Sequence, residues 1–115
     1  MKLKQTIDNL SALAQETRLR AFRLLVRMGE AGLPAGKIAE DLNVNATTLS
    51  RHLAVMEAAG LIYSERKVRQ IIYRVDFAAV RSLFTFLLED CCAGDTRFFG
   101  ASCEPAIDLQ NKGEI

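Results

Sequence analysis

Apolar residues recur at spacings of three and four through the first half of the chain, and this period predicts four amphipathic helices. The helices cover about residues 3–14, 16–28, 34–42 and 46–59. Each helix should bury one stripe of its surface. The four stripes, in chain order, are Leu3, Ile7, Leu10 and Leu13; Leu19, Phe22, Leu25 and Val26; Ile38, Ala39 and Leu42; and Leu49, Leu53 and Met56.

Residues that end or start helices separate these segments. Gly29 and Gly32 end the second helix, and Pro34 suits the first turn of the third. Residues 43–45 form a tight turn, and Asn45 is a suitable cap for the fourth helix. The third and fourth helices are therefore predicted to be joined by a tight turn.

The pattern changes after Gly60, which ends the fourth helix. Residues 61–64 and 70–75 are typical of strands, and the short basic stretch 65–69 between them predicts a β-hairpin. A last helix is predicted over about residues 76–92, with a heptad repeat that is typical of a helix packing along a partner helix. The members of this repeat are Phe77, Val80, Phe84, Leu87 and Cys91.

Together these elements predict a mainly α-helical chain with a small β-hairpin wing, which is a winged helix-turn-helix. The major groove of DNA admits one helix, and the fourth helix presents small polar and basic side chains away from its apolar stripe. The residues expected to contact DNA are Thr47, Thr48, Ser50, Arg51 and His52 on this helix, and Arg66, Lys67 and Arg69 in the hairpin. For His52, a phosphate or packing contact is favoured over a metal ligand, because it flanks the buried stripe. The alternative is a small helical domain whose polar face is merely solvated.

Charge is unevenly distributed, although the whole chain carries only +1. Residues 18–74 hold 10 Lys and Arg against 5 Asp and Glu, whereas residues 75–115 hold 3 against 7. A basic middle followed by an acidic end is expected of a module that binds a polyanion. The 115 residues suit one domain, and the sequence has no apolar run of membrane length and no recognisable signal peptide. We therefore expect a cytoplasmic protein with no membrane partner.

Three segments resemble the ArsR/SmtB family of winged-helix repressors. They are residues 13–25, with LAQETRLR; residues 48–62, with TLSRHL and EAAGLI; and residues 73–75, YRV. The resemblance covers about residues 8–90 and implies a homodimer that represses a metal or metalloid resistance operon until an inducer binds. The first and last helices would form the dimer interface through Leu3, Ile7, Leu10, Phe77, Val80, Phe84 and Leu87. Ala46 stands where many family members carry glutamine, so the operator sequence is not carried over.

Three cysteines lie near the C-terminus, and their odd number argues against a disulfide framework. Cys91 and Cys92 fall in the last predicted helical turn, and Cys103 follows across a glycine-containing loop that can fold back. Structural zinc takes four ligands, and no histidine follows His52. Trivalent arsenic and antimony take three thiolates, so As(III) or Sb(III) is the expected inducer, held by these three cysteines. Arsenite-responsive family members that build their site at the end of the last helix are similar.

We therefore expect residues 1–92 to form the DNA-binding and dimerisation domain, and residues 93–115 a partly flexible segment with the third cysteine. The expected function is repression of an arsenic-resistance operon, relieved when the inducer binds. The same fold could instead sense another soft metal, such as cadmium or lead, or oxidation of its thiols. An interaction module without DNA binding stays open, as does a purely structural role for Cys91. A thiol enzyme is not expected, because Glu89 and Asp90 precede the cysteine pair and no phosphate-cradling loop accompanies it.

Overall fold

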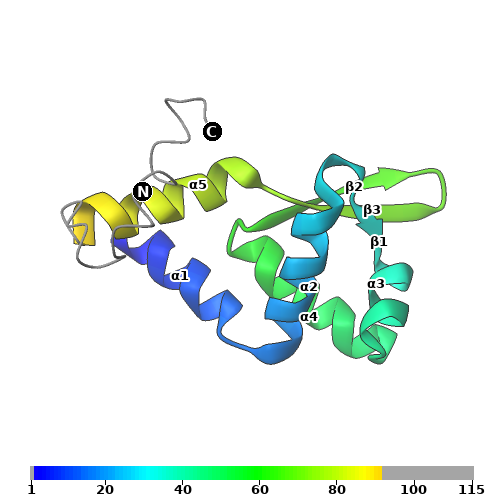
Figure 1. Ribbon diagram of the computed structural model, residues 1–115. Helices are drawn as coiled ribbons and strands as arrows, with labels where there is room; N and C mark the ends of the chain where they lie inside the picture. The colour runs from blue at the N-terminus through cyan, green and yellow to red at the C-terminus, as the bar shows by residue number, and fades with distance from the viewer. Residues whose placement is uncertain (1, 92–115) are drawn as a thin grey trace. The chain divides into compact units, whose positions relative to one another are not determined.

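The computed structural model describes residues 2–91, and for residues 89–91 it describes the backbone alone. The helices are α1 (Leu3–Leu13), α2 (Glu16–Met28), the 3-10 turn η1 (Gly29–Ala31), α3 (Ala35–Leu42), α4 (Ala46–Ala58), α5 (Phe77–Thr85) and the π-helical turn η2 (Phe86–Cys91). The strands are β1 (Leu33–Pro34), β2 (Ile62–Lys67) and β3 (Gln70–Val75). The chain divides into two units, Met1–Leu83 and Phe84–Ile115, and the first contains α1 to α4 and the three strands (Figure 1).

The three strands form one antiparallel sheet in the order β1-β3-β2. β2 and β3 pair along their whole length, so only Val68 and Arg69 form the turn of the hairpin. β1 pairs with the other edge of β3, with Leu33 opposite Tyr73. The hairpin extends away from the helices as a wing (Figure 1).

The predicted helices of the first unit and the hairpin are confirmed, with two differences at the strands. The first wing strand runs to Lys67 rather than ending at Ser64, because residues 65–67 continue the ladder instead of forming a loop. The sequence pattern does not predict β1, since a two-residue strand is too short to show alternation. Pro34 consequently belongs to this strand and precedes α3 instead of lying in its first turn.

The last helix departs from its predicted course. Its apolar repeat predicts one α-helix over residues 76–92, whereas α5 ends at Thr85 and the chain continues as η2 to Cys91. A π-helical turn contains more residues than an α-helical turn. The α-helical phase on which the heptad repeat depends therefore ends at Thr85.

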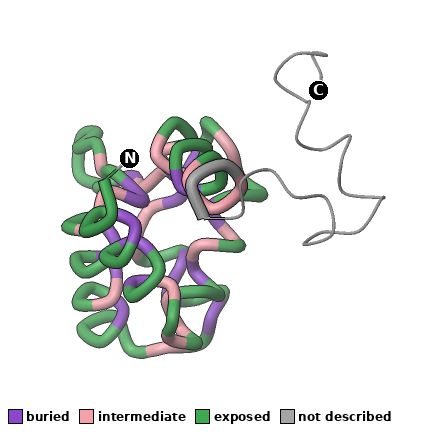
Figure 2. Tube along the Cα trace, turned by 90° about the vertical axis from the view of Figure 1, so that its left-hand side faces the viewer, coloured by how far each residue is buried: buried purple, intermediate pink, exposed green. Residues whose placement is uncertain are grey.

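The core of the first unit lies between α2, α3, α4 and the sheet. Leu49, Leu53 and Met56 of α4 are at most 1% exposed, so the stripe predicted for this helix is confirmed. The stripe predicted for α3 is confirmed as well. Figure 2 shows the buried positions along the trace. The other core residues are Ala12, Ala21, Leu25, Leu33, Ile38, Ala39, Leu42, Leu61, Ile62 and Val75.

The stripe predicted for α2 is wrong in part. Leu25 is buried and Phe22 is partly buried, but Leu19 and Val26 are 44% and 40% exposed. Ala21 faces the core instead. The small side chain of Ala21 allows α2 to approach its neighbours closely. A stripe chosen from the large apolar residues does not reveal this.

The stripe predicted for α1 is also wrong within the single chain. Leu3, Ile7 and Leu10 are 64%, 55% and 44% exposed, and only Leu13 packs partly against the core. The buried residues of α1 are instead Thr6, Asn9 and Ala12. The apolar stripe of α1 is therefore left on the surface of the protomer.

We predict that Gly32 tolerates substitution less well than Gly29. Both have positive φ, 65° and 59°, so alanine would strain either position by about 1–3 kcal/mol. A Cβ at Gly32 would also lie 2.6 Å from the carbonyl oxygen of Tyr73, whereas no described atom lies within 4 Å of a Cβ at Gly29. Urea unfolding at one protein concentration should show a larger loss of stability for Gly32→Ala than for Gly29→Ala. Equal losses would contradict the close approach of β1 to β3.

Candidate nucleic-acid interface

The turn between α3 and α4 is fixed by two asparagines. Asn43 follows α3 in the left-handed conformation, with φ 56°, which asparagine tolerates better than most residues. The side-chain Oδ1 of Asn45 accepts hydrogen bonds from the backbone N–H groups of Thr47 and Thr48, at 2.7 and 3.3 Å. The predicted cap is confirmed, and it satisfies donors at the start of α4 that have no partner within the helix.

The helix α4 has one apolar and one polar side. Because Leu49, Leu53 and Met56 are buried, the residues on the opposite side face solvent. The structure leaves four of the predicted DNA-contacting residues exposed on this helix: Thr47, Thr48, Ser50 and Arg51. They offer three hydroxyl groups and one guanidinium on a single helix.

The fifth residue, His52, is half-buried on the flank of α4. Its Nδ1 lies 3.3 Å from Nη1 of Arg18, whose Nε donates to the carbonyl oxygen of Ala12 at 2.6 Å. A guanidinium can only donate, so we infer that Nδ1 accepts and that Nε2 carries the ring proton. The packing role considered for His52 is therefore supported, and a DNA contact through Nε2 stays a prediction.

The wing carries the predicted basic residues in exposed positions. Arg66 and Lys67 are consecutive in β2, so their side chains point to opposite faces of the hairpin, and Arg69 lies in the turn. None of the three forms an ion pair with another residue in the described part of the chain. Their charges are thus available to an anionic partner.

At the base of the wing, charges are already paired. Nη1 of Arg74 lies 2.6 Å from Oε1 of Glu65, and its Nε donates to the carbonyl oxygen of Glu30 at 2.7 Å. Burial, and to a lesser extent the Glu57 carboxylate, raises the pKa of Tyr73. Its hydroxyl therefore stays neutral at physiological pH and keeps a proton to donate.

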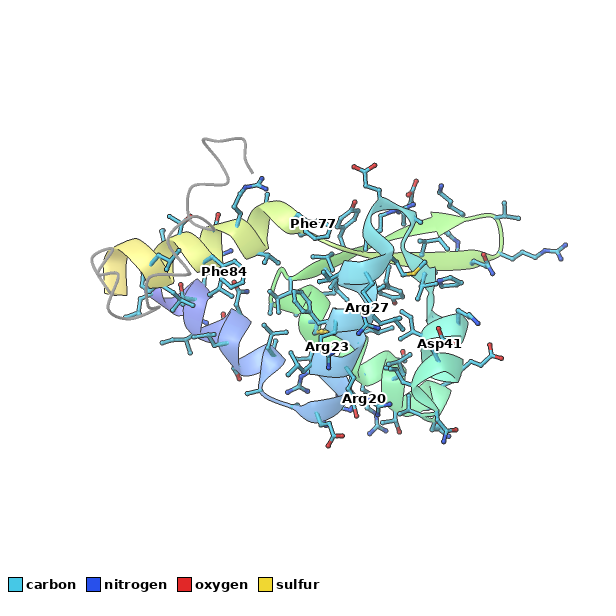
Figure 3. The ribbon with its side chains drawn as sticks, in the orientation of Figure 1. Arg20, Arg23, Arg27, Asp41, Phe77 and Phe84 are labelled. Carbon is cyan, nitrogen blue, oxygen red and sulfur yellow. The ribbon has the colours of Figure 1, made fainter. Side chains whose placement is uncertain are left out.

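An open groove of about 650 Å³ lies between the N-terminal end of α3 and the wing. Its lining includes Lys37 of α3 and Arg69 of the wing turn. Lys37 is already 3.2 Å from Asp41, which Figure 3 shows on α3, so Arg69 is the cation in this groove without an ion pair among the described residues. Glu40 of α3 also lines the groove, so the charges around it are mixed.

Comparisons with known proteins agree with this geometry. Residues 13–65 match the model of a helix-turn-helix domain family. The fold resembles that of an ArsR-like transcriptional regulator from Rhodococcus sp. RHA1, with a TM-score of 0.70, 26% identity, and coverage of 94% of this chain and 93% of that chain. Over 89 residues the sequence is 31% identical to the HTH-type transcriptional regulator YgaV of Escherichia coli K12, covering 77% of this chain and 88% of YgaV.

The chain belongs to the ArsR/SmtB family. It is 29% identical to a biofilm growth-associated repressor of Xylella fastidiosa, covering 80% of this chain and 78% of that protein. It also resembles the homodimeric winged helix-turn-helix domain of a possible ArsR-family regulator from Mycobacterium bovis, with a TM-score of 0.62, 26% identity, and coverage of 71% of this chain and 74% of that chain. This ArsR/SmtB-family chain is therefore a DNA-binding transcriptional repressor and not an enzyme. In its described part, no helix is long and apolar enough to cross a membrane.

Five of the seven residues that the family resemblance assigns to the dimer interface are exposed apolar side chains. Besides the α1 stripe, Phe77 is 40% and Phe84 57% exposed, and Figure 3 shows both on α5. Val80 and Leu87 are half-buried. Exposed apolar residues clustered on a helix mark a protein interaction site more often than single ones do.

The predicted metalloid site lies mostly outside the described residues. Cys91 is the last residue of η2, and Cys92 and Cys103 are outside. In the part of the chain that is described, no three His, Cys, Asp or Glu residues cluster as metal ligands would. The three-cysteine site stays a prediction.

The sequence reasoning assigns no role to two features of the structure. Arg20, Arg23 and Arg27 are exposed along α2 (Figure 3), and Nη2 of Arg20 donates to the carbonyl oxygen of Leu42 at the end of α3, at 3.3 Å. Their spacing of three and four residues indicates one basic helix face. The second feature is Asn9, whose side chain reaches the end of α4 from α1. The sequence signals it only weakly: Asn9 is a polar residue spaced three positions from Thr6 and Ala12, the other two buried residues of α1.

We predict that Arg69→Gln reduces the salt dependence of DNA binding. Each neutralised phosphate contributes a slope of about −0.9 to the logarithm of affinity against the logarithm of salt, so a dimer that loses two contacts should have a slope shallower by about 2. Fluorescence anisotropy over a salt series measures this slope. The control is Lys4→Gln on α1, which should leave it unchanged. An Arg69→Gln slope equal to the native slope would remove the wing turn from the interface.

Proposed function

We propose that this ArsR/SmtB-family chain is a homodimeric repressor of an arsenic-resistance operon, released from its operator when As(III) or Sb(III) binds Cys91, Cys92 and Cys103. The observation that carries the DNA part of the proposal is the polar side of α4, which is exposed because its apolar side is completely buried. The inducer part is supported by the chemistry of the donor set. Three thiols match the number and softness of ligands that trivalent arsenic takes.

In this proposal, α4 enters the major groove. The hydroxyl groups of Thr47 and Ser50 and the guanidinium of Arg51 reach base edges and phosphates. The wing lies against the backbone, where Arg69 in its turn contacts phosphate. The many cationic contacts give affinity, whereas the few contacts to base edges give sequence preference.

Homodimer formation would cover the apolar stripe of α1. An exposed row of Leu3, Ile7 and Leu10 is costly to hydrate, and burying it against a second copy removes this surface from water. A two-fold dimer also presents two recognition helices, which a palindromic operator requires. The exposed aromatic residues of α5 would extend the same kind of contact.

We predict that Ile7→Glu converts the dimer into a monomer. A carboxylate placed in an apolar interface would have to be buried without a partner. Sedimentation velocity at micromolar concentration should show the mass of one chain for Ile7→Glu and of two chains for the native protein. The matched control, Gln5→Glu, changes an exposed polar residue of the same helix and should stay dimeric. A dimeric Ile7→Glu protein would place the interface elsewhere.

The cysteines would act on the interface through the chain that connects them to it. α5 carries Phe77 and Phe84, and η2 continues it to Cys91. Binding of Cys103 and the adjacent pair to one ion would reorder the end of this helical segment. Two recognition helices must match major grooves about 34–36 Å apart, so a shift in the interface weakens operator binding. A coupling of about 1–3 kcal/mol is typical of such allosteric systems.

We predict that arsenite releases the native protein from its operator under reducing conditions, and that Cys91→Ser, Cys92→Ser and Cys103→Ser each abolish release while keeping DNA binding. Loss of one thiolate leaves an incomplete ligand set. Anisotropy of a labelled operator fragment titrated with arsenite measures the effect. Ser102→Ala, next to Cys103 but without a change in thiol number, is the control and should respond like the native protein.

The same titration separates the proposal from its alternatives. Release by cadmium or lead but not by arsenite would favour a different soft metal. Release by hydrogen peroxide, reversed by a thiol reductant, with no response to arsenite would favour a redox sensor. Either result would overturn the arsenic assignment and leave the DNA-binding function intact.

A further inference from the structure

Two side chains connect the recognition helix α4 to α1, one from α1 itself and one that bridges them from α2. Asn9 of α1 donates its Nδ2–H to the carbonyl oxygen of Ala59, at the C-terminal end of α4, over 2.6 Å. Arg18 contacts His52 in the middle of α4 and donates to Ala12 in the last turn of α1. α4 is therefore connected to α1 at two points along its length.

These polar contacts fix the position of α4 along its own axis, relative to α1. The burial of Leu49, Leu53 and Met56 decides which side of α4 faces inward, whereas apolar contacts by themselves have no directional preference. Hydrogen bonds depend on both distance and angle. The bonds from Asn9 and Arg18 therefore fix the axial position of α4 relative to α1.

Asn9 is a costly choice if stability alone is considered. It is 0% exposed, and its Oδ1 has no hydrogen-bond partner among the described residues. A leucine, which has the same branched shape, would avoid the unsatisfied oxygen, although it would leave the Ala59 carbonyl without this donor. A buried polar group kept at such a cost is expected where one particular arrangement has to be specified.

The opposite side of α1 bears the exposed stripe of Leu3, Ile7 and Leu10. If this stripe is the dimer contact, α1 lies between the partner subunit and α4. We propose that Asn9 and Arg18 are positioning residues that transmit the dimer geometry to α4 and so set the separation of the two recognition helices over the operator. The inference rests on the proposed function, because it requires a homodimer that binds DNA.

The test uses operators that differ only in half-site spacing. The full-length native chain first selects an operator from random duplex DNA, and one base pair is then inserted or removed at its centre, which changes the separation by about 3.4 Å. Anisotropy measures the affinities of native chain and Asn9→Leu for the three operators and for random duplex. The matched control is Thr6→Val: Thr6 is 3% exposed on the same side of α1, but its hydroxyl donates to the carbonyl oxygen of Lys2, the residue just before that helix, and not to α4.

We expect Asn9→Leu to bind the selected operator about tenfold more weakly, within the range of about 5- to 150-fold typical of coupling between sites, with a flattened dependence on spacing and unchanged affinity for random duplex. Thr6→Val should keep the native spacing profile. A folded Asn9→Leu dimer with the native profile, or one that loses affinity equally for every duplex, would overturn the proposal. If Asn9→Leu does not fold, Arg18→Met decides by the same criteria. A native chain that selects no duplex would count against the proposed function instead.

Discussion

The complete burial of one side of α4 is the constraint on which the DNA-binding surface depends. Leu49, Leu53 and Met56 have almost no exposure, so the helix cannot rotate without breaking the core. The opposite side is thereby committed to solvent, and the small polar and basic residues there are presented as one surface. The Asn45 cap adds a defined starting point, because it satisfies the first free N–H groups without help from other elements.

The helix-turn-helix also depends on helices outside it. The carbonyl oxygen of Leu42 at the end of α3 accepts from Arg20 of α2, and that of Ala59 at the end of α4 accepts from Asn9 of α1. Terminal carbonyls have no partner within their own helix. α1 and α2 thus each supply a hydrogen-bond donor to one terminal carbonyl of the helix-turn-helix, while the apolar stripe of α1 stays exposed on its other side. This arrangement joins the part of the protomer that would form the dimer to the part that would bind DNA.

Apolar periodicity was sufficient to predict the buried side of a helix where the same chain covers that side. The stripes of α3 and α4 are predicted correctly because their apolar residues are buried within the chain. The α1 stripe is wrong for the protomer, because periodicity identifies an apolar side but not whether the same chain or a second copy covers it. β1 is too short to have a pattern, and η2 changes the helical period without a proline or glycine to mark it. Asn9 could not be found, because its bond to Ala59 joins residues 50 positions apart.

The proposed molecule is a two-fold repressor whose paired recognition helices fit successive major grooves. Its thiols near the C-terminus are proposed to control release from DNA. The central claim concerns how the dimer lies on DNA, before any inducer is added. Hydroxyl-radical footprinting of the native chain on a duplex that it selects tests this claim most directly. The account predicts two protected stretches on one face of the duplex, centred about one helical turn apart. A single protected stretch, or no localised protection, would contradict it.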